Sequence, residues 1–251
     1  VDLIAMLSPL PGLESLGLTT NGFLLATMAP DLWRAGLRQI NISLDSLDPE
    51  RFADVTQCTD YERVMQGVET AFLCGFKIKI NVVAIQGLSE AEILGFAGLA
   101  ERFPIDVRFI ELMPLSDTGC DPKRHLPMAQ IRQPIEARYE LQRQPRTEVA
   151  DVFEIKPGLG RIGFIASMSD PFCSDCSRLR LTADGHLMPC LFSKIELSIK
   201  PLLRGTACDT ELADAMTDIV WQKPRGHGIV NFGSTAVADA TVYPHIRYIG
   251  G

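Results

Sequence analysis

Two hydrophobic periodicities alternate through the first half of the chain. Apolar runs typical of strands cover residues 16–20, 39–44, 77–85 and 106–112, and helical patterns cover residues 26–35, 61–74 and 90–102. Ser89 stands directly before the last of these helices, where an N-cap is expected. This alternation predicts a parallel sheet with crossover helices. An open doubly wound sheet and part of a barrel both fit the pattern.

One face of the predicted strands is polar. Asn41, Ser43 and Asp45 alternate with apolar neighbours, and Lys79 and Asn81 share a face of the next strand. A buried parallel strand is normally apolar on both faces, and a buried lysine is costly unless it is paired or faces a ligand. Two interpretations stay open: a ligand site at the carboxyl ends of the strands, or an internal pairing of Lys79 with Asp45.

The pattern changes near residue 120, where prolines become frequent, so we predict two regions, 1–120 and 121–251. In the second region short strands are expected at 152–155, 163–167, 178–182 and 186–191, and helices at 200–203 and 210–222. Ala-Asp-Gly at 183–185 predicts a hairpin between the last two strands.

The composition narrows the class of protein. The 251 residues are 46% hydrophobic, so a core can form, and the net charge of −7 argues against a general nucleic-acid binder. We expect no membrane span and no secretory signal, hence a cytoplasmic protein. Seven unevenly spaced cysteines argue against a disulfide framework. Four of them are interpreted as small buried hydrophobes: Cys58, Cys74, Cys120 and Cys208.

The other three cysteines form a C-x2-C-x13-C pattern of Cys173, Cys176 and Cys190. The predicted hairpin returns the third thiol to the first two, and three soft ligands suit zinc or an iron–sulfur cluster. A closed zinc site needs a fourth ligand, for which Asp175 and His186 are candidates. A three-cysteine cluster leaves one iron open. Spacing alone slightly favours zinc, and free buried thiols are the third interpretation.

Basic residues follow the first cysteine pair. In an extended strand, Arg178, Arg180 and Thr182 share one face. Two guanidinium groups beside a metal centre predict a site for phosphate or carboxylate, because arginine binds these groups bidentately. The alternative is an exposed strand face with solvated arginines.

Six motifs in order give the chain a close resemblance to the GTP 3′,8-cyclase family of molybdenum cofactor biosynthesis, whose members are radical S-adenosylmethionine (SAM) enzymes. They are Leu-Thr-Thr-Asn-Gly at 18–22, Ile-Asn-Ile-Ser-Leu-Asp at 40–45, Lys-Ile-Asn-Val at 79–82, Arg-Phe-Ile-Glu-Leu-Met at 108–113, the cysteine segment 172–192 and Tyr-Ile-Gly-Gly at 248–251.

The resemblance implies an α/β fold: an incomplete radical-SAM (βα)6 partial TIM barrel, with about four βα units in residues 1–120. A smaller α+β region, 121–251, would bind GTP and an auxiliary [4Fe-4S] cluster through Cys173, Cys176 and Cys190. By position, the resemblance also implies GTP contacts at Thr19, Lys79, Arg108, Arg178 and Arg180. It implies SAM contacts at Ser43 and Met113, and a catalytic tail at Gly250 and Gly251. From the residues alone, a Gly-Gly tail is also expected to fray.

The implied function is conversion of GTP to a cyclised pyranopterin precursor, with SAM and two [4Fe-4S] clusters. The implied partners are GTP, SAM, an electron donor and the downstream cyclic pyranopterin monophosphate synthase; a homodimer is also considered. The alternatives are a radical SAM enzyme of another pathway with an auxiliary cluster, and a zinc-stabilised binding module.

Two motifs of the family are absent from the sequence. The C-x3-C-x2-C segment and the Gly-Gly-Glu-Pro turn of the family do not occur in the 251 residues, so the chain is expected to be a truncated member. That segment holds the cluster that supplies the electron for SAM cleavage. A polypeptide of these residues alone is therefore expected to be inactive. The check is 5′-deoxyadenosine formation after anaerobic reconstitution, and turnover would contradict the expectation.

Overall fold

The computed structural model describes residues 1–114, 121–145 and 149–226. The chain forms two compact units. Unit 1 comprises Val1–Glu111 and Leu126–Ala166, and unit 2 comprises Leu112–His125 and the chain from Ser167 onward. The predicted boundary near residue 120 differs from this division. Residues 126–166 return to unit 1 because their strands extend its sheet, which local patterning could not reveal.

A seven-stranded sheet forms the centre of unit 1, in the order β1-β2-β3-β4-β7-β6-β5. The first five strands in this order run parallel, and β6 and β5 run antiparallel to their neighbours. The four strands predicted in the first half are confirmed within two residues at their ends. The bounds are β1 Gly17–Thr20, β2 Gln39–Ser43, β3 Lys77–Ala84, β4 Asp106–Glu111, β5 Glu140–Arg143, β6 Asp151–Lys156 and β7 Arg161–Ile165.

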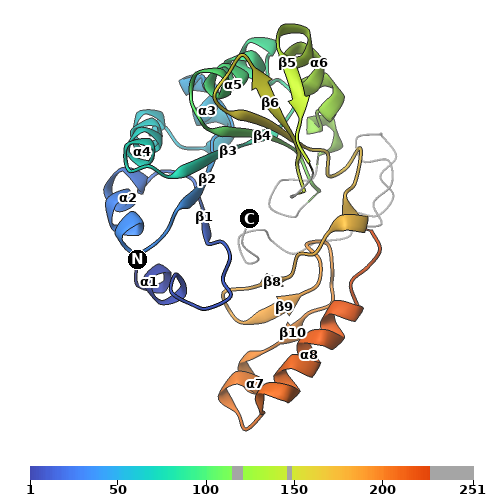
Figure 1. Cartoon of the computed structure of the whole chain (residues 1–251). Coiled ribbons are helices and arrows are strands. Elements are labelled where there is room, and N and C mark those ends of the chain that lie inside the picture. Colours follow the sequence, from blue (N-terminus) through green and yellow to red (C-terminus); the bar gives the residue numbers. More distant parts are fainter. Residues whose placement is uncertain (115–120, 146–148, 227–251) are drawn as a thin grey trace. The chain divides into compact units, whose positions relative to one another are not determined.

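Helix α1 precedes the first strand of unit 1, and the other helices of the unit lie in the connections between its strands. They are α1 Asp2–Leu7, α2 Leu25–Arg34, α3 Pro49–Thr56, α4 Tyr61–Leu73, α5 Glu90–Arg102 and α6 Met128–Arg138. Figure 1 shows α2, α4 and α5 along the outer side of the curved sheet. Helices on one side only are typical of a barrel, and a doubly wound sheet would carry them on both faces. The predicted partial barrel is thus confirmed, whereas α1, α3, α6 and β5 were not predicted.

The core of unit 1 lies between the outer sheet face and the helices. Ile40, Ile42 and Ile80 are almost fully buried on this face, and Phe109 contacts Phe96 edge-on at 6.1 Å between ring centroids. Burying each such side chain contributes about 1.5–3 kcal/mol. The outer face therefore supplies the stability of unit 1, and the inner face is available for polar groups.

Ser89 caps α5 as predicted. Its hydroxyl accepts from the Glu92 backbone N–H at 3.2 Å, and the Glu92 carboxylate returns to the Ser89 N–H, which completes a capping box. The same carboxylate accepts from the buried Ser46 hydroxyl at 2.6 Å and pairs with Arg51 at 3.5 Å. One glutamate therefore joins the start of α5 to the loop after β2.

Gly160 lies against the carbonyl groups that follow α5. A Cβ at this position would sit 2.1 Å from the Ile105 oxygen and 2.7 Å from the Phe103 oxygen, both backbone atoms. We expect Gly160→Ala to destabilise unit 1 by about 1–3 kcal/mol, because the backbone must shift. Gly98→Ala in α5 is the control: its Cβ would meet only the Tyr139 hydroxyl, at 4.0 Å, so stability should rise by up to ~1 kcal/mol. Urea unfolding followed by circular dichroism measures both changes, and equal effects would contradict this.

Unit 2 contains a small antiparallel sheet in the order β10-β9-β8. The predicted hairpin is confirmed with shorter strands, and Gly185 adopts a positive φ of 88° in its turn. Leu187, Ile199 and Ile219 form its buried apolar cluster. The elements are η2 Pro122–Arg124, η3 Cys173–Asp175, β8 Arg180–Leu181, β9 His186–Met188, β10 Leu197–Ser198, α7 Lys200–Arg204 and α8 Asp209–Trp221. In the described ranges, no helix has the length and apolar character needed to cross a membrane.

Candidate functional site

The inner face of the unit 1 sheet carries two adjacent rows of polar residues, which we call the polar strand face. Register partners on neighbouring strands share a face, and residues two apart on one strand do so as well. The first row is Thr19, Asn41, Lys79, Asp106, Arg161 and Glu154. The second row is Ser43, Asn81, Arg108 and Gly163.

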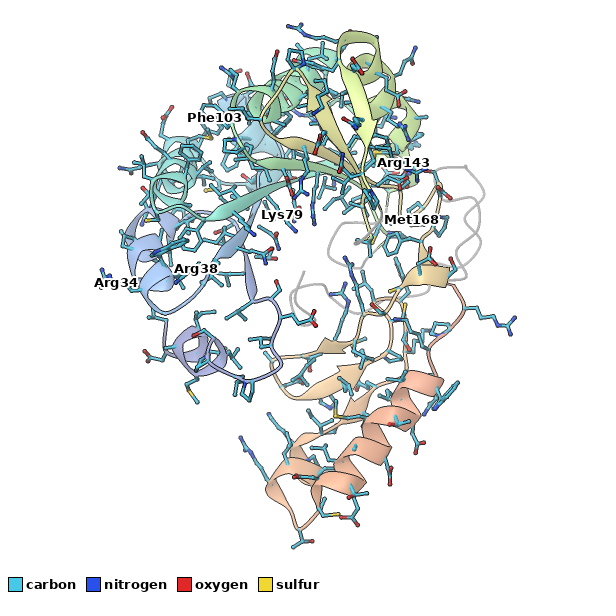
Figure 2. The ribbon with its side chains drawn as sticks, viewed as in Figure 1. Arg34, Arg38, Lys79, Phe103, Arg143 and Met168 are labelled. Atoms are coloured by element: carbon cyan, nitrogen blue, oxygen red, sulfur yellow. The ribbon has the colours of Figure 1, made fainter. Side chains whose placement is uncertain are left out.

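Four site residues predicted from the sequence meet on the polar strand face: Thr19, Ser43, Lys79 and Arg108. Thr19 and Ser43 are exposed, Lys79 is half-buried and Arg108 is buried. Figure 2 shows Lys79 on the inner side of the curved sheet, whereas Arg34 of α2 extends from the outer side. Strands lie about 4.8 Å apart, so these groups can contact one ligand of nucleotide size.

Hydrogen bonds order the first row. The Asn41 side-chain amide donates to the Thr19 hydroxyl at 3.2 Å. At the other end, Arg161 donates to both oxygens of Asp106, at 2.8 and 2.6 Å. Bidentate, charge-assisted hydrogen bonds of this kind are stronger than hydrogen bonds between neutral groups. Arg161 was missed in the sequence because the strand was expected to begin only at residue 163.

Asp45 follows β2 at the carboxyl end of the sheet. Its Oδ1 accepts a hydrogen bond from the Val83 backbone N–H of β3 at 2.8 Å. The Asp45 side chain thus bonds β3 beyond the last residue of β2. Burial raises the pKa of the Asp45 carboxyl, while the Val83 hydrogen bond and the Arg51 charge oppose that rise. Asp45 therefore links two strand ends where ligands of such sheets gather.

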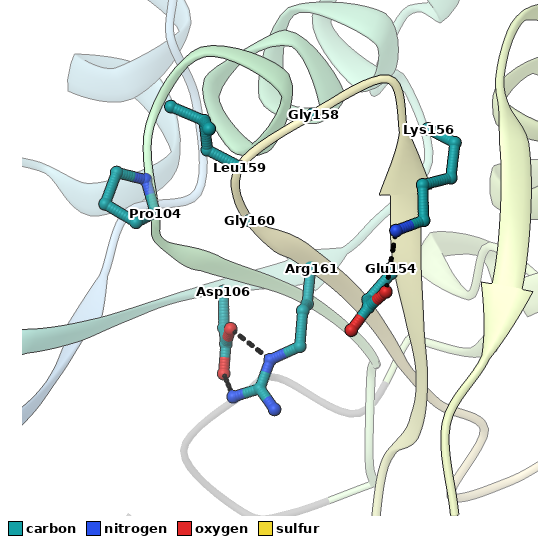
Figure 3. A pocket seen from close by; sticks show the side chains of 8 residues that line it. All are labelled: Pro104, Asp106, Glu154, Lys156, Gly158, Leu159, Gly160 and Arg161. Atoms are coloured by element: carbon teal, nitrogen blue, oxygen red, sulfur yellow. Dashed lines mark hydrogen bonds and ion pairs between the residues drawn. The ribbon is translucent and has the colours of Figure 1, made fainter.

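A pocket of about 370 Å³ lies at the opposite end of the sheet, where β4 and β7 begin. Figure 3 shows its charged groups paired with each other: Arg161 with Asp106, and Lys156 with Glu154 at 2.9 Å. Leu159 and the glycines on either side of it complete the wall. These charges are already compensated within the protein, and the pocket is away from the carboxyl ends of the parallel strands.

The end of β4 leads into unit 2. Glu111 is fully buried, and its carboxylate accepts from the backbone N–H of Met128, the first residue of α6, at 2.9 Å. Met113, the second predicted SAM contact, is half-buried in unit 2. Glu111 therefore holds the start of a helix, a role that the motif did not indicate.

The predicted metal ligands lie around the hairpin of unit 2. Cys173 begins the 3-10 turn η3, and the Cys176 backbone N–H donates to the Cys173 oxygen at 3.3 Å. Cys190 lies two residues after β9, the second strand of the hairpin. All three thiols are half-buried. Thiolates are the usual ligands of iron–sulfur clusters, so these three cysteines match such a group in donor chemistry.

Two arginines accompany these thiols. Arg180 is half-buried in β8, and burial and the like charge of Arg178 lower the pKa of its guanidinium, whereas Cys190 and Cys176 raise it. Arg178, Cys176 and Cys190 therefore each lie within electrostatic reach of Arg180. Arg178 is exposed, and its guanidinium lies 5.8 Å from the centre of the Phe172 ring. Two cations held this close favour an anion between or beside them.

The strand expected over residues 178–182 is shorter in the structure, because of Arg178, Arg180 and Thr182 only Arg180 belongs to β8. The Arg178 carbonyl accepts from the Lys223 ammonium at 2.7 Å instead of joining the strand ladder. The buried Thr182 hydroxyl accepts from the His186 backbone N–H at 2.8 Å and bonds the Asp184 carboxylate, which places it in the hairpin turn.

The proposed fourth zinc ligands do not join the cysteines. His186 Nδ1 lies 3.1 Å from the Asp184 carboxylate, and Asp175 is exposed in η3. Within residues 1–114, 121–145 and 149–226, no three His, Cys, Asp or Glu side chains are arranged to hold a metal ion. A single zinc ion needs its ligands at one point, whereas each cysteine of a cluster binds a different iron. The geometry gives no support to the zinc interpretation.

Lys223 is a site residue that the sequence did not indicate. It follows α8, and its ammonium lies 3.4 Å from the Cys176 sulfur. A lysine after a helix is too common to signal a contact 47 residues away. Gly250, Gly251 and Cys120 lie outside the described residues.

Comparisons with known proteins agree with the motifs. Residues 1–100 match the model of the radical SAM superfamily, and residues 105–229 match the model described as Molybdenum Cofactor Synthesis C. The human protein named molybdenum cofactor biosynthesis protein 1 is 41% identical over 231 residues, which cover 90% of this chain and 36% of the human protein. The chain thus spans about a third of the length of this relative and of its bovine and mouse counterparts.

Shorter relatives are covered more fully. The GTP 3′,8-cyclase of Moorella thermoacetica is 41% identical over 235 residues, covering 92% of this chain and 73% of that protein. The mitochondrial GTP 3′,8-cyclase of Arabidopsis thaliana is 38% identical over 241 residues, covering 94% and 62%. By this identity and coverage, the chain belongs to the GTP 3′,8-cyclase family of radical SAM proteins.

Proposed function

We propose that the protein acts in molybdenum cofactor biosynthesis as a GTP 3′,8-cyclase, which converts GTP to (8S)-3′,8-cyclo-7,8-dihydroguanosine 5′-triphosphate. The observation that carries this proposal is the arrangement of Arg178 and Arg180 beside Cys176 and Cys190. A nucleoside triphosphate that binds at an iron–sulfur centre needs an anion site beside the cysteine ligands of that centre.

Cys173, Cys176 and Cys190 would hold an auxiliary [4Fe-4S] cluster. Cysteine binds such a cluster as the thiolate. When bound, a cluster with three cysteine ligands supplies one iron with an open position for a substrate atom. The residues of unit 2 then bind and orient the anionic part of the substrate.

GTP contacts are proposed at Arg178 and Arg180 in unit 2 and at Thr19, Lys79 and Arg108 in unit 1. The two cations of unit 1 lie on the polar strand face, where Lys79 is half-buried and Arg108 is buried. Ser43 and Met113 are proposed SAM contacts, and Gly250 and Gly251 a proposed catalytic tail. The electron donor, the downstream synthase, a homodimer and a cytoplasmic location also belong to the proposal.

The test is metal and sulfide analysis of the chain after purification and reconstitution without oxygen, followed by calorimetric titration with GTP. About four irons and matching sulfide for the three cysteines, with GTP binding that is lost without iron, support the proposal. One zinc per chain and no GTP binding would instead favour the zinc-stabilised module.

A further inference from the structure

Lys223 contacts the cysteine hairpin from the end of a helix. It follows α8, and its own backbone N–H donates to the Val220 oxygen at 3.0 Å. Its ammonium donates to the Arg178 carbonyl at 2.7 Å and lies 3.4 Å from the Cys176 sulfur. The side chain is half-buried. One ammonium therefore bonds a predicted metal ligand and the backbone two residues beyond it.

The fold holds this lysine in place from both sides. Ile219, one turn before it, packs with Leu187 of β9 and with Ile199, and thereby anchors α8 to the hairpin. Pro224 follows directly and cannot continue the helix. Ordering a lysine side chain costs up to about 2 kcal/mol of rotamer entropy. The two contacts of the Lys223 ammonium offset this cost.

The charge balance indicates what that interaction does. Arg178, Arg180 and Lys223 bring three positive charges to the side of Cys176. The two arginines are proposed to bind the anionic substrate, whereas the Lys223 ammonium contacts the Cys176 sulfur itself. Hydrogen bonds to cluster sulfurs and local charge set the reduction potential of an iron–sulfur centre. A cation at this sulfur stabilises the reduced form more, since that form carries one more negative charge.

We propose that Lys223 is a positioning residue of the cluster site, which orients Cys176 and raises the reduction potential of the bound cluster through an N–H···S hydrogen bond. The inference rests on the proposed function, because it requires the cluster. It assigns to the end of α8 a role in controlling the electron affinity of the substrate-holding centre.

The experiment compares the reconstituted wild-type chain with three variants. Lys223→Met removes charge and donor, Lys223→Gln removes only the charge, and Lys223→Arg keeps both. Lys123→Met, an exposed lysine of unit 2, is the matched control. Iron content, circular dichroism and an electron paramagnetic resonance titration of the midpoint potential are measured for each.

We expect Lys223→Met to shift the one-electron reduction equilibrium at least tenfold toward the oxidised form, ~59 mV in potential. Lys223→Gln should lie between it and the wild type, and Lys223→Arg should restore most of the difference. If both neutral variants match the wild-type potential, or if neither has a lower potential than Lys123→Met, the inference fails while the cluster stands. A wild-type chain that binds no iron overturns both. Should Lys223→Met fail to fold, the Gln and Arg pair decides.

Discussion

Replacement of Cys190 by alanine is expected to abolish iron binding by the reconstituted chain. Cys190 lies two residues after β9, whereas Cys173 begins the turn η3 and Cys176 directly follows it. With Cys190 removed, two cysteines of one turn remain, and they cannot hold a cluster that normally takes three or four thiolates. Iron and sulfide per chain should fall from about four to near zero.

Cys208→Ser is the control for this variant. The prediction that Cys208 is a small buried hydrophobe is wrong, because Cys208 is exposed at the start of α8. Its side chain accepts from the helix backbone there, and serine preserves that cap. Its iron content should equal that of the wild type. Full iron loading of Cys190→Ala, with the broad absorption of a cluster retained, would show that the cluster ligands are other residues.

Arg180→Met should weaken GTP binding by about 10- to 150-fold. Charge-assisted hydrogen bonds contribute about 1.5–3 kcal/mol, and Arg180 is half-buried beside the second arginine. Methionine keeps much of the apolar length, so the change reports the guanidinium. The readout is the calorimetric Kd for GTP in the iron-loaded chain, with iron content measured in parallel.

Arg204→Met is the matched control, because Arg204 is an exposed arginine in the last turn of α7. Its Kd for GTP should not change. The double replacement of Arg178 and Arg180 should exceed the single one, since the remaining arginine can still bind a phosphate. An unaltered Kd for Arg180→Met at full iron loading would assign the hairpin arginines to hairpin stability alone.

Much of unit 1 was predictable because its signals are local. The alternation of polar and apolar residues along 39–44 and 77–85 indicates both the strands and the face that carries Lys79. Ser89 and Glu92 mark the start of α5 in the sequence, and the capping box forms as that pattern predicts. Register between strands is not local, but parallel strands that bury one apolar face can pair in few ways.

The errors arise where pairing is distant. Residues 161–165 pair with β4, some fifty residues earlier, so no local pattern assigns them to unit 1. Helix α6 contains Pro134, which argued for a boundary rather than a helix. In unit 2, the Arg178 carbonyl accepts from the Lys223 ammonium, and only the folded chain brings these residues together.

The polar strand face has a consequence for how such a protein can change over generations. On β3, Lys79 lies between Ile78 and Ile80, so residues that bind and residues that stabilise alternate one by one. A substitution at an inner position alters the chemistry offered to a ligand without opening a cavity in the packed layer. Recognition on this sheet can therefore evolve by single replacements while the scaffold is retained.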